Sequence, residues 1–340
     1  MPRQSSAKKR ITINDIAQMA GTSKTTVSFY LNGKTDRMSE DTQKRIRKAI
    51  KDTGYEPSPL ARGMNAKQSH LIGVIIGDIT NAFSNQIVKG IDTVISAEGY
   101  RMLVCSSNFN KQNEAAYIDR LLALGVDGFI VQPTAQFKEI TRQISEAQKP
   151  LVFIDSKLYD FAASWVKTDN YEASYQAIEE CVAKGYKRFL VITAEPGLIS
   201  SRIERMSGFV DALESHDIGF TQFVIENDQV DEEKLGAFLK ANIDGQAPTL
   251  VFAPNCWALP DIYRCFRDYY PLMPDRVGLL GFDNTEWVDV ASPAVSVVVQ
   301  PAREEGSAAA RILLDAIAEK DSAEPHQVLD CHVHWGETTL

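Results

Sequence analysis

From residue 70 onward, short apolar and β-branched runs alternate with longer segments of helical character. The runs lie at 71–76, 101–106, 128–132, 151–155, 189–193, 249–253 and 277–282. Most are apolar at consecutive positions, which is typical of strands that are buried on both faces. Because helical segments separate the runs, the pattern predicts an α/β fold with parallel sheets covered on both sides by helices.

Four of these runs precede Asp169 and three follow it, so the sequence predicts two similar α/β lobes. Parallel sheets bind ligands outside the carboxyl ends of their strands. Two lobes that face each other in this way would enclose a cleft for a small ligand. The length of 340 residues, with 44% apolar content, is enough for two or three domains.

The N-terminal region has a purely helical pattern. An approximate capping box at Thr12 precedes a short helix, and Gly21 can end that helix in a left-handed conformation. Ser23 can cap a second helix over 24–31, and a third helix is expected over 39–53. Two short helices joined by a glycine turn are the layout of a helix-turn-helix.

Charge is distributed unevenly along the chain. Residues 1–68 hold 14 Lys and Arg against 6 Asp and Glu, a net charge of +8. The remaining residues hold 22 against 39, a net charge of −17. A basic helical module on an acidic body indicates a protein that binds DNA phosphates through that module.

The segment Thr12-Ile-Asn-Asp-Ile-Ala-Gln-Met-Ala-Gly-Thr-Ser-Lys-Thr-Thr-Val-Ser28 resembles the N-terminal signature of the lactose/galactose repressor (LacI/GalR) family. Gly54-Tyr-Glu-Pro57 and Ala61-Arg-Gly-Met64 resemble the linker of that family, in which a short helix forms on DNA. The resemblance extends over essentially the full chain. It implies a ligand-responsive transcription regulator.

The resemblance implies three parts: a helix-turn-helix headpiece over 1–56, a linker helix over 57–69 and an effector-binding core over 70–340. The core is expected to be periplasmic-binding-protein-like, with a ligand that sets the orientation of its lobes and thereby controls the headpiece. The expected lobes are 70–165 with 298–325, and 166–297 with 326–340.

The resemblance also implies which residues contact DNA. Lys24 and Thr25 match positions that read base edges in the major groove. Phe29 replaces the family's usual arginine, which predicts an apolar contact with a thymine methyl group instead of guanine readout. Met64 replaces the leucine that wedges into the minor groove. The other expected contacts are Thr12, Ser23, Thr26, Ser28, Asn32 and Ala61.

The expected effector-binding residues follow strand ends or match ligand-contacting segments of the family. Pro254 stands where the family commonly has asparagine, so Asn255 or Trp257 is expected to supply that contact. The full set is Asp78, Phe83, Ser84, Asp155, Lys157, Ser201, Arg205, Asn255, Trp257, Asp283 and Gln300.

These side chains suit a sugar-like effector, because aromatic faces cover the C–H face of a ring and polar groups bind hydroxyls. Arg205 and Lys157 favour an acidic sugar over a neutral one. The segment Asn284-Thr-Glu-Trp287 resembles a family branch that responds to keto-sugar acids such as 2-keto-3-deoxygluconate or 2-ketogluconate. A sugar phosphate is the alternative, because it would also pair with Arg205 and Lys157.

Other classes of function have less support in the sequence. No GxSxG elbow, Walker loop, HExxH or GxGxxG after the first strand occurs, so neither an enzyme nor a cofactor is expected. The five cysteines are scattered and include no CxxC pair. His332-Val-His334 is expected on a strand, where the two histidines could form a metal-ligand pair, but a surface pair without metal is favoured and no metal site is expected. A sugar-binding protein without DNA function would lack the basic region 1–68.

The expected setting is cytoplasmic, because no apolar run reaches the ~18 residues of a membrane span and no signal peptide is evident. The expected partner is a palindromic double-stranded operator. A single small headpiece makes few contacts, whereas two headpieces gain from binding together. We therefore expect a homodimer.

The headpiece assignment predicts that Lys24→Ala and Thr25→Ala change which operator bases are preferred, because both residues lie where base edges are read. Loss of one good bidentate contact should cost about 1 to 3 kcal/mol. Binding measured on a set of single-base operator variants tests this. An equal loss on every variant and on non-specific DNA would show that the two residues contact phosphates only.

Overall fold

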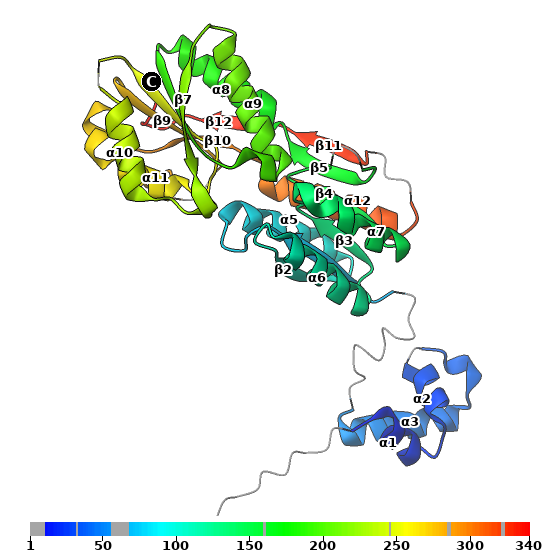
Figure 1. The fold of residues 1–340 in the computed structure, drawn as a ribbon. Coiled ribbons are helices and arrows are strands. Elements are labelled where there is room, and N and C mark those ends of the chain that lie inside the picture. The colour runs from blue at the N-terminus through cyan, green and yellow to red at the C-terminus, as the bar shows by residue number, and fades with distance from the viewer. Residues whose placement is uncertain are drawn as a thin grey trace, which may run out of the picture. The chain divides into compact units, whose positions relative to one another are not determined.

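The structure is a computed structural model that describes residues 11–31, 33–55, 68–158, 161–244, 246–283, 287–320 and 324–340. The chain forms two compact units, Met1–Ser69 and His70–Leu340. Figure 1 labels most of their helices and strands. No helix in these ranges is both long and apolar enough to cross a membrane.

The first unit is a three-helix headpiece, as expected. Its helices are α1 (Ile13–Met19), α2 (Lys24–Leu31) and α3 (Glu40–Thr53), with a 3-10 turn η1 (Thr35–Arg37) before α3. The Thr12 capping box is present, and Gly21 and Gly54 both have a positive φ. Val27 of α2 packs with Ile16 and Ile46 in a small apolar core. The predicted helix-turn-helix is therefore confirmed.

The second unit contains two six-stranded sheets (Figure 1). The first has the order β11-β5-β4-β3-β1-β2, and the second has the order β12-β10-β9-β8-β6-β7. All neighbouring strands are parallel except β12, which runs antiparallel to β10. The expected α/β fold with two parallel-sheet lobes is confirmed.

The first lobe consists of the following elements: β1 (Leu71–Ile76), α5 (Ala82–Ala97), β2 (Arg101–Ser106), α6 (Lys111–Ala123), β3 (Gly128–Val131), η2 (Ala135–Phe137), α7 (Lys138–Glu146), β4 (Leu151–Ile154), β5 (Ser164–Thr168), α12 (Ala302–Ile317) and β11 (His326–Leu329). Helices α5 and α12 pack on one face of its sheet, and α6 and α7 pack on the other.

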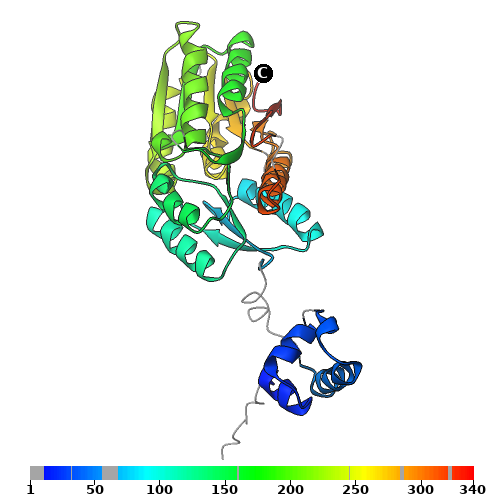
Figure 2. The same cartoon turned by 90° about the vertical axis from the view of Figure 1, so that its right-hand side faces the viewer.

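The second lobe consists of α8 (Asn170–Ala183), β6 (Arg188–Ala194), η3 (Pro196–Leu198), α9 (Ser200–Glu214), β7 (Phe220–Ile225), η4 (Glu226–Asp228), α10 (Glu232–Asn242), β8 (Thr249–Ala253), α11 (Leu259–Cys265), η5 (Arg267–Leu272), β9 (Val277–Phe282), β10 (Ser296–Val299) and β12 (His332–His334). Helices α8 and α9 cover one face of the sheet, and α10 and α11 cover the other (Figure 2).

The chain crosses between the lobes three times, after β5, after β10 and after β11. The expected lobe boundaries need correction at these points. Strands β5 and β11 belong to the first sheet and β10 belongs to the second, so boundaries at 165/166, 297/298 and 325/326 are misplaced. The boundaries were misplaced because the strands that precede the crossings, β5, β10 and β11, were not predicted from the sequence.

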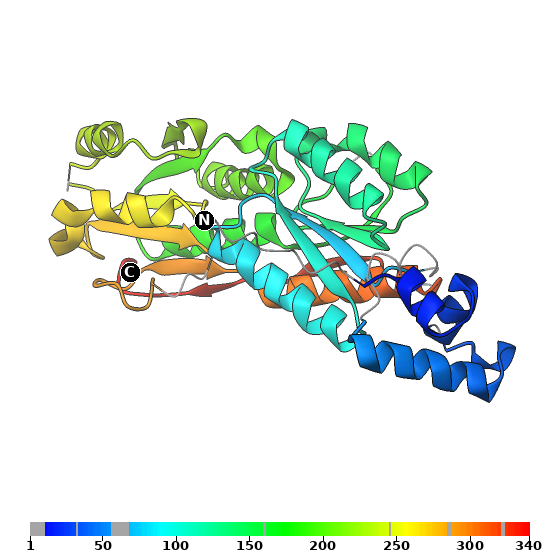
Figure 3. The same cartoon turned by 90° about the horizontal axis from the view of Figure 1, so that it is seen from below.

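Helices α5 and α12 lie side by side under the first sheet (Figure 3). Two glycines permit this close approach. A Cβ atom on Gly90 would lie 2.1 Å from the carbonyl oxygen of Arg303, and one on Gly306 would lie 2.1 Å from that of Ile87. Because both obstacles are backbone atoms, they cannot move without displacing a helix.

Gly306→Ala should therefore destabilise the core by about 1 to 3 kcal/mol, as overpacking does. Gly236→Ala in α10 is the matched control, because a Cβ there meets nothing within 4 Å. That change should stabilise the protein by about 0.5 to 1 kcal/mol through the better helix propensity of alanine. Urea unfolding of both variants measures the difference, and equal stabilities would contradict the packing inferred here.

Candidate functional site

A cleft lies between the carboxyl ends of the two sheets in the second unit. Its inner part is lined by residues that follow strands of both lobes: Asn81, Phe83, Phe109, Gln132, Asp155, Ile199, Ser201, Arg202, Arg205, Asn255, Cys256, Trp257 and Gln300. An outer compartment of about 270 Å³ is lined by Asp78, Asn81, Asn108, Phe109, Arg202, Asn227, Asp228 and Trp257.

The structure brings most of the expected effector-binding residues together. The inner part of the cleft contains Phe83, Asp155, Ser201, Arg205, Asn255, Trp257 and Gln300, and the outer part contains Asp78. Both Asn255 and Trp257, the two alternatives for one expected contact, line the inner part. Their roles as ligand contacts stay predictions.

Three expected residues are not among those that line the cleft. Ser84 is buried in the first turn of α5. The Lys157 ammonium group lies 5.1 Å from the centre of the Trp165 ring, so its charge points toward that ring. Asp283 is buried directly after β9, close to the buried Glu305. At these positions the three side chains suit a supporting role behind the residues that line the cleft.

Arg205 lines the inner cleft and is only 6% exposed. Its guanidinium group donates to Asn170 Oδ1 at 2.7 Å, to the Pro254 carbonyl oxygen at 2.8 Å and to Gln300 Oε1 at 2.9 Å. It also lies 3.8 Å from the centre of the Phe282 ring. Arg205 therefore joins three segments of the cleft wall by hydrogen bonds, and it also carries a positive charge there.

Arg202 is a second buried cation that the sequence analysis missed. It lies one helical turn before Arg205 on α9, and it is 4% exposed. Its Nη1 lies 3.4 Å from Asp228 Oδ1 and 3.4 Å from the Glu195 carbonyl oxygen. Burial lowers the pKa of Arg202, and Asp228 opposes this shift. The spacing of three residues from Arg205 was the available signal, since it places both on one helix face.

Asp155 provides acceptor atoms on the opposite side of the cleft. Its Oδ2 accepts from Gln132 Nε2 at 2.7 Å and from the Ser201 hydroxyl group at 3.3 Å. Its backbone has a φ of +60°, an uncommon value for a residue other than glycine. The Ser201 contact joins the two lobes directly across the cleft.

Glu305 lies behind Asp155 and was also missed. It is fully buried in the first turn of α12, and its Oε1 accepts from the Asp155 backbone N–H. Its Oε2 has no hydrogen-bond partner within the described ranges. Burial raises the pKa of Glu305 well above 4.5, and the charges of Asp155 and Asp283 add to the shift. Glu305 therefore binds a proton more tightly than an ordinary glutamate.

Further contacts hold the lobes together beside the cleft. Lys167 of β5 pairs with Glu204 of α9 at 2.7 Å, and both side chains are about nine-tenths buried. The Lys157 backbone N–H donates to the Ser200 hydroxyl group at 3.1 Å. These contacts describe a closed arrangement of the two lobes.

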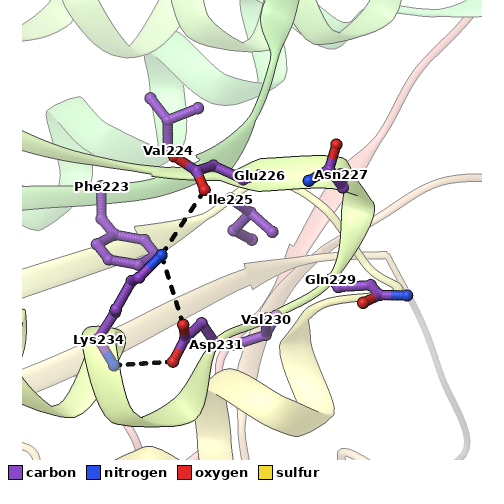
Figure 4. Close-up of a pocket in the computed structure, with 9 residues that line it drawn as sticks. All are labelled: Phe223, Val224, Ile225, Glu226, Asn227, Gln229, Val230, Asp231 and Lys234. Carbon is purple, nitrogen blue, oxygen red and sulfur yellow. Dashed lines mark hydrogen bonds and ion pairs between the residues drawn. The ribbon is translucent and has the colours of Figure 1, made fainter.

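A separate pocket of about 440 Å³ lies at the edge of the second lobe, between β7, η4 and α10. Figure 4 shows Lys234 between the carboxylates of Glu226 and Asp231, at 3.7 and 3.6 Å. Because two acids already neutralise its cation, this pocket offers little unpaired charge to a ligand. No group of metal-binding side chains is found within the described residues.

In the headpiece, Lys24 and Thr25 are exposed at the start of α2. Phe29 is half-buried, with the Arg37 guanidinium group 5.4 Å from its ring centre, so a cation lies beside the position where the family usually has arginine. Ser28 is also half-buried. The Thr12 hydroxyl group bonds to Asp15.

Two further expected DNA contacts are engaged in capping α2. The Ser23 hydroxyl group accepts from the Thr26 backbone N–H at 3.1 Å and lies 2.9 Å from the Thr26 hydroxyl group. Their proposed contacts with DNA would compete with these bonds. Asn32, Ala61 and Met64, together with most of the expected linker over 57–69, lie outside the described residues.

Comparisons with protein families match the whole architecture. Residues 12–58 match bacterial regulatory proteins of the lacI family, and residues 69–255 match the periplasmic binding proteins and sugar binding domain of the LacI family. Residues 178–339 match a periplasmic binding protein-like domain.

Individual relatives agree with these matches. The chain is 32% identical over 320 residues to the HTH-type transcriptional regulator KdgR of Bacillus subtilis, which covers 93% of this chain and 94% of that protein. It is 30% identical over 311 residues to the regulator PtxS of Pseudomonas putida, covering 90% and 89%.

Solved structures show the same fold. A LacI-family regulator from Silicibacter pomeroyi has a TM-score of 0.82 at 20% identity, covering 96% of this chain and 99% of that one. The lac repressor dimer bound to operator and the anti-inducer ONPF has a TM-score of 0.79 at 20% identity, covering 98% and 100%.

The buried carboxyl group predicts a specific pH dependence. Between pH 4.5 and the raised pKa of Glu305, the folded protein holds a proton that the unfolded chain has lost. The free energy of unfolding contributed by this group therefore falls as pH rises through that window. Glu305→Gln cannot titrate, so its stability relative to the wild type should increase from about pH 5 to about pH 8.

Chemical denaturation of both proteins at the two pH values measures this difference. Glu304→Gln is the control, because Glu304 is exposed and adjacent in sequence. The stability difference between Glu304→Gln and the wild type is expected to stay constant with pH. If the difference for Glu305→Gln also stays constant, Glu305 has an ordinary pKa.

Proposed function

This chain belongs to the LacI family of bacterial regulators, and we propose that an acidic sugar in its interlobe cleft controls its affinity for operator DNA. The family assignment makes the chain a DNA-binding transcriptional regulator with an effector-binding core. The proposal adds the chemical class of the effector and the residues that bind it. We propose a cytoplasmic regulator without enzymatic activity.

The two buried arginines of α9 carry this proposal. Arg202 and Arg205 both line the inner cleft, and neither is more than 6% exposed. A neutral sugar would leave their charge without an added partner, whereas a carboxylate can accept several of their N–H groups. Both terminal nitrogens of Arg205 have a second N–H beyond the contacts described above.

The rest of the cleft suits the remainder of a sugar acid. Phe83 and Trp257 provide apolar surface, and Asp155, Asn255 and Gln300 provide polar atoms for hydroxyl groups. Because burial raises the pKa of Glu305, this carboxyl group opposes a bound carboxylate less than an ordinary glutamate would. We therefore favour an acid with several hydroxyl groups over a nucleobase.

Within this class, we propose a 2-keto sugar acid. The similarity of Asn284-Thr-Glu-Trp287 to the keto-acid-responsive branch supports this choice, although residues 284–286 lie outside the described ranges. Trp287 packs against Tyr263 in the core of the second lobe, with ring centres 5.4 Å apart, and it is not among the residues that line the cleft. A sugar phosphate is the second candidate, because the same arginines would bind its phosphate.

On the DNA side, we propose that a homodimer places two headpieces on a palindromic operator. Lys24 and Thr25 are exposed at the start of α2, where a recognition helix reads base edges. Arg37, beside Phe29, adds a cation near the same surface. The exposed positive charge of α3 is suited to phosphate contacts.

Calorimetry on the full chain tests the effector class. We expect 2-keto-3-deoxygluconate or 2-ketogluconate to bind with a dissociation constant of about micromolar. Arg202→Ala and Arg205→Ala should weaken binding about tenfold or more, because each removes a charged hydrogen-bond donor.

Arg142→Ala is the matched control, since Arg142 is exposed on α7 and should leave binding unchanged. Tighter binding of a sugar phosphate would support the second candidate. Binding of neutral sugars alone, unaffected by Arg202→Ala, would contradict the acidic effector.

A further inference from the structure

The loop that follows β2 holds an unusual backbone conformation beside the cleft. Asn108 and Phe109 both have a φ of +52°, the left-handed region that side chains rarely adopt. Two such residues in succession, one of them aromatic, are unfavourable unless surrounding contacts hold them in place.

The Phe109 ring fits against Gly77 at the end of β1. A Cβ atom on Gly77 would lie only 2.1 Å from Phe109 Cζ, so the ring occupies space that any other residue would fill. The Asn108 backbone N–H donates to the Gly77 carbonyl oxygen at 2.6 Å, which fixes the loop there. On the cleft side, the Arg202 guanidinium group lies 5.5 Å from the ring centre.

The ring stands at the boundary between the two compartments of the cleft. Phe109, Arg202, Asn81 and Trp257 line both the inner and the outer part. The outer part measures about 270 Å³, whereas the inner part measures about 30 Å³. An inner part of that size holds about one or two water molecules. A ligand site usually has about 300 Å³ or more.

We propose that Phe109 is a displaceable plug, which fills the effector's place in the ligand-free cleft and leaves when the effector binds. This inference rests on the acidic effector proposed above. On displacement, Asn108 and Phe109 can relax from the left-handed region, and Arg202 exchanges the aromatic ring for the carboxylate of the ligand. A ligand therefore has to replace both a flat apolar surface and a partner for Arg202.

The plug makes Phe109 a determinant of affinity and specificity. The plugged state competes with the effector, so the measured affinity is reduced by the fraction of molecules that are plugged. A fixed aromatic wall that stacks on the ligand would act in the opposite direction, because its removal would weaken binding. The sign of the change upon removing the ring thus separates the two roles.

Two variants remove the plug in different ways. Phe109→Ala deletes the ring, and Gly77→Ala keeps the ring but places a methyl group where it rests. Gly77 does not have a positive φ, so alanine is compatible with its backbone. Calorimetry with 2-keto-3-deoxygluconate should show binding at least about threefold tighter than wild type in both variants. Phe109→Leu, which keeps most of the bulk, should lie closer to wild type.

A measurement without ligand distinguishes failure of the plug from failure of the acidic effector. Acrylamide quenches tryptophan fluorescence, and the Trp257 signal is the difference between each protein and the same protein carrying Trp257→Phe. Quenching of this signal should increase in both variants as the inner cleft opens. If no sugar acid binds any protein but quenching increases, the effector class is wrong and the plug stands. Weaker binding in both variants, or unchanged Trp257 quenching, would overturn the plug.

Discussion

The hydrogen bonds of Arg205 hold together the region where the chain crosses between its lobes. Asn170 begins α8 after the first crossing, Gln300 follows β10 at the second, and the Pro254 carbonyl group lies at the end of β8. An almost fully buried guanidinium group is costly unless its donors are satisfied, so these segments are fixed relative to one another. Arg205 therefore ties together the segments through which the chain passes between its lobes.

The charge balance of the cleft depends on a buried carboxyl group as well as on ion pairs. Arg202 and Arg205 line the inner cleft together with Asp155, and burial raises the pKa of Glu305, so this carboxyl group offsets the two cations less than an ordinary glutamate would. At such buried positions, electrostatic attraction is stronger than at the surface. Glu305 does not line the cleft, yet its raised pKa is consistent with the anionic effector proposed above.

The sequence predicted local features well and long-range ones poorly. The capping residue Thr12 and the turn at Gly21 carry their own signals, and the continuous apolar runs predicted seven strands. Strand β7 was missed because its exposed edge carries polar residues, and β5 and β11 were missed because polar residues interrupt their apolar ones. Strand β10, with the sequence Ser-Val-Val-Val, carries an apolar signal that was not singled out. Phe109 and Glu305 gave no motif, since their importance comes from residues distant in sequence, Gly77 and Asp155.

We propose that ligand binding in the cleft and operator binding by the headpiece are energetically linked. Fluorescence anisotropy of a labelled operator, titrated with the full chain at zero and at saturating 2-keto sugar acid, measures this linkage directly. We expect the operator dissociation constant to change by about fivefold to 150-fold, and the affinity for the acid to change by the same factor when operator is present. An operator affinity that is identical with and without bound acid would contradict the claim.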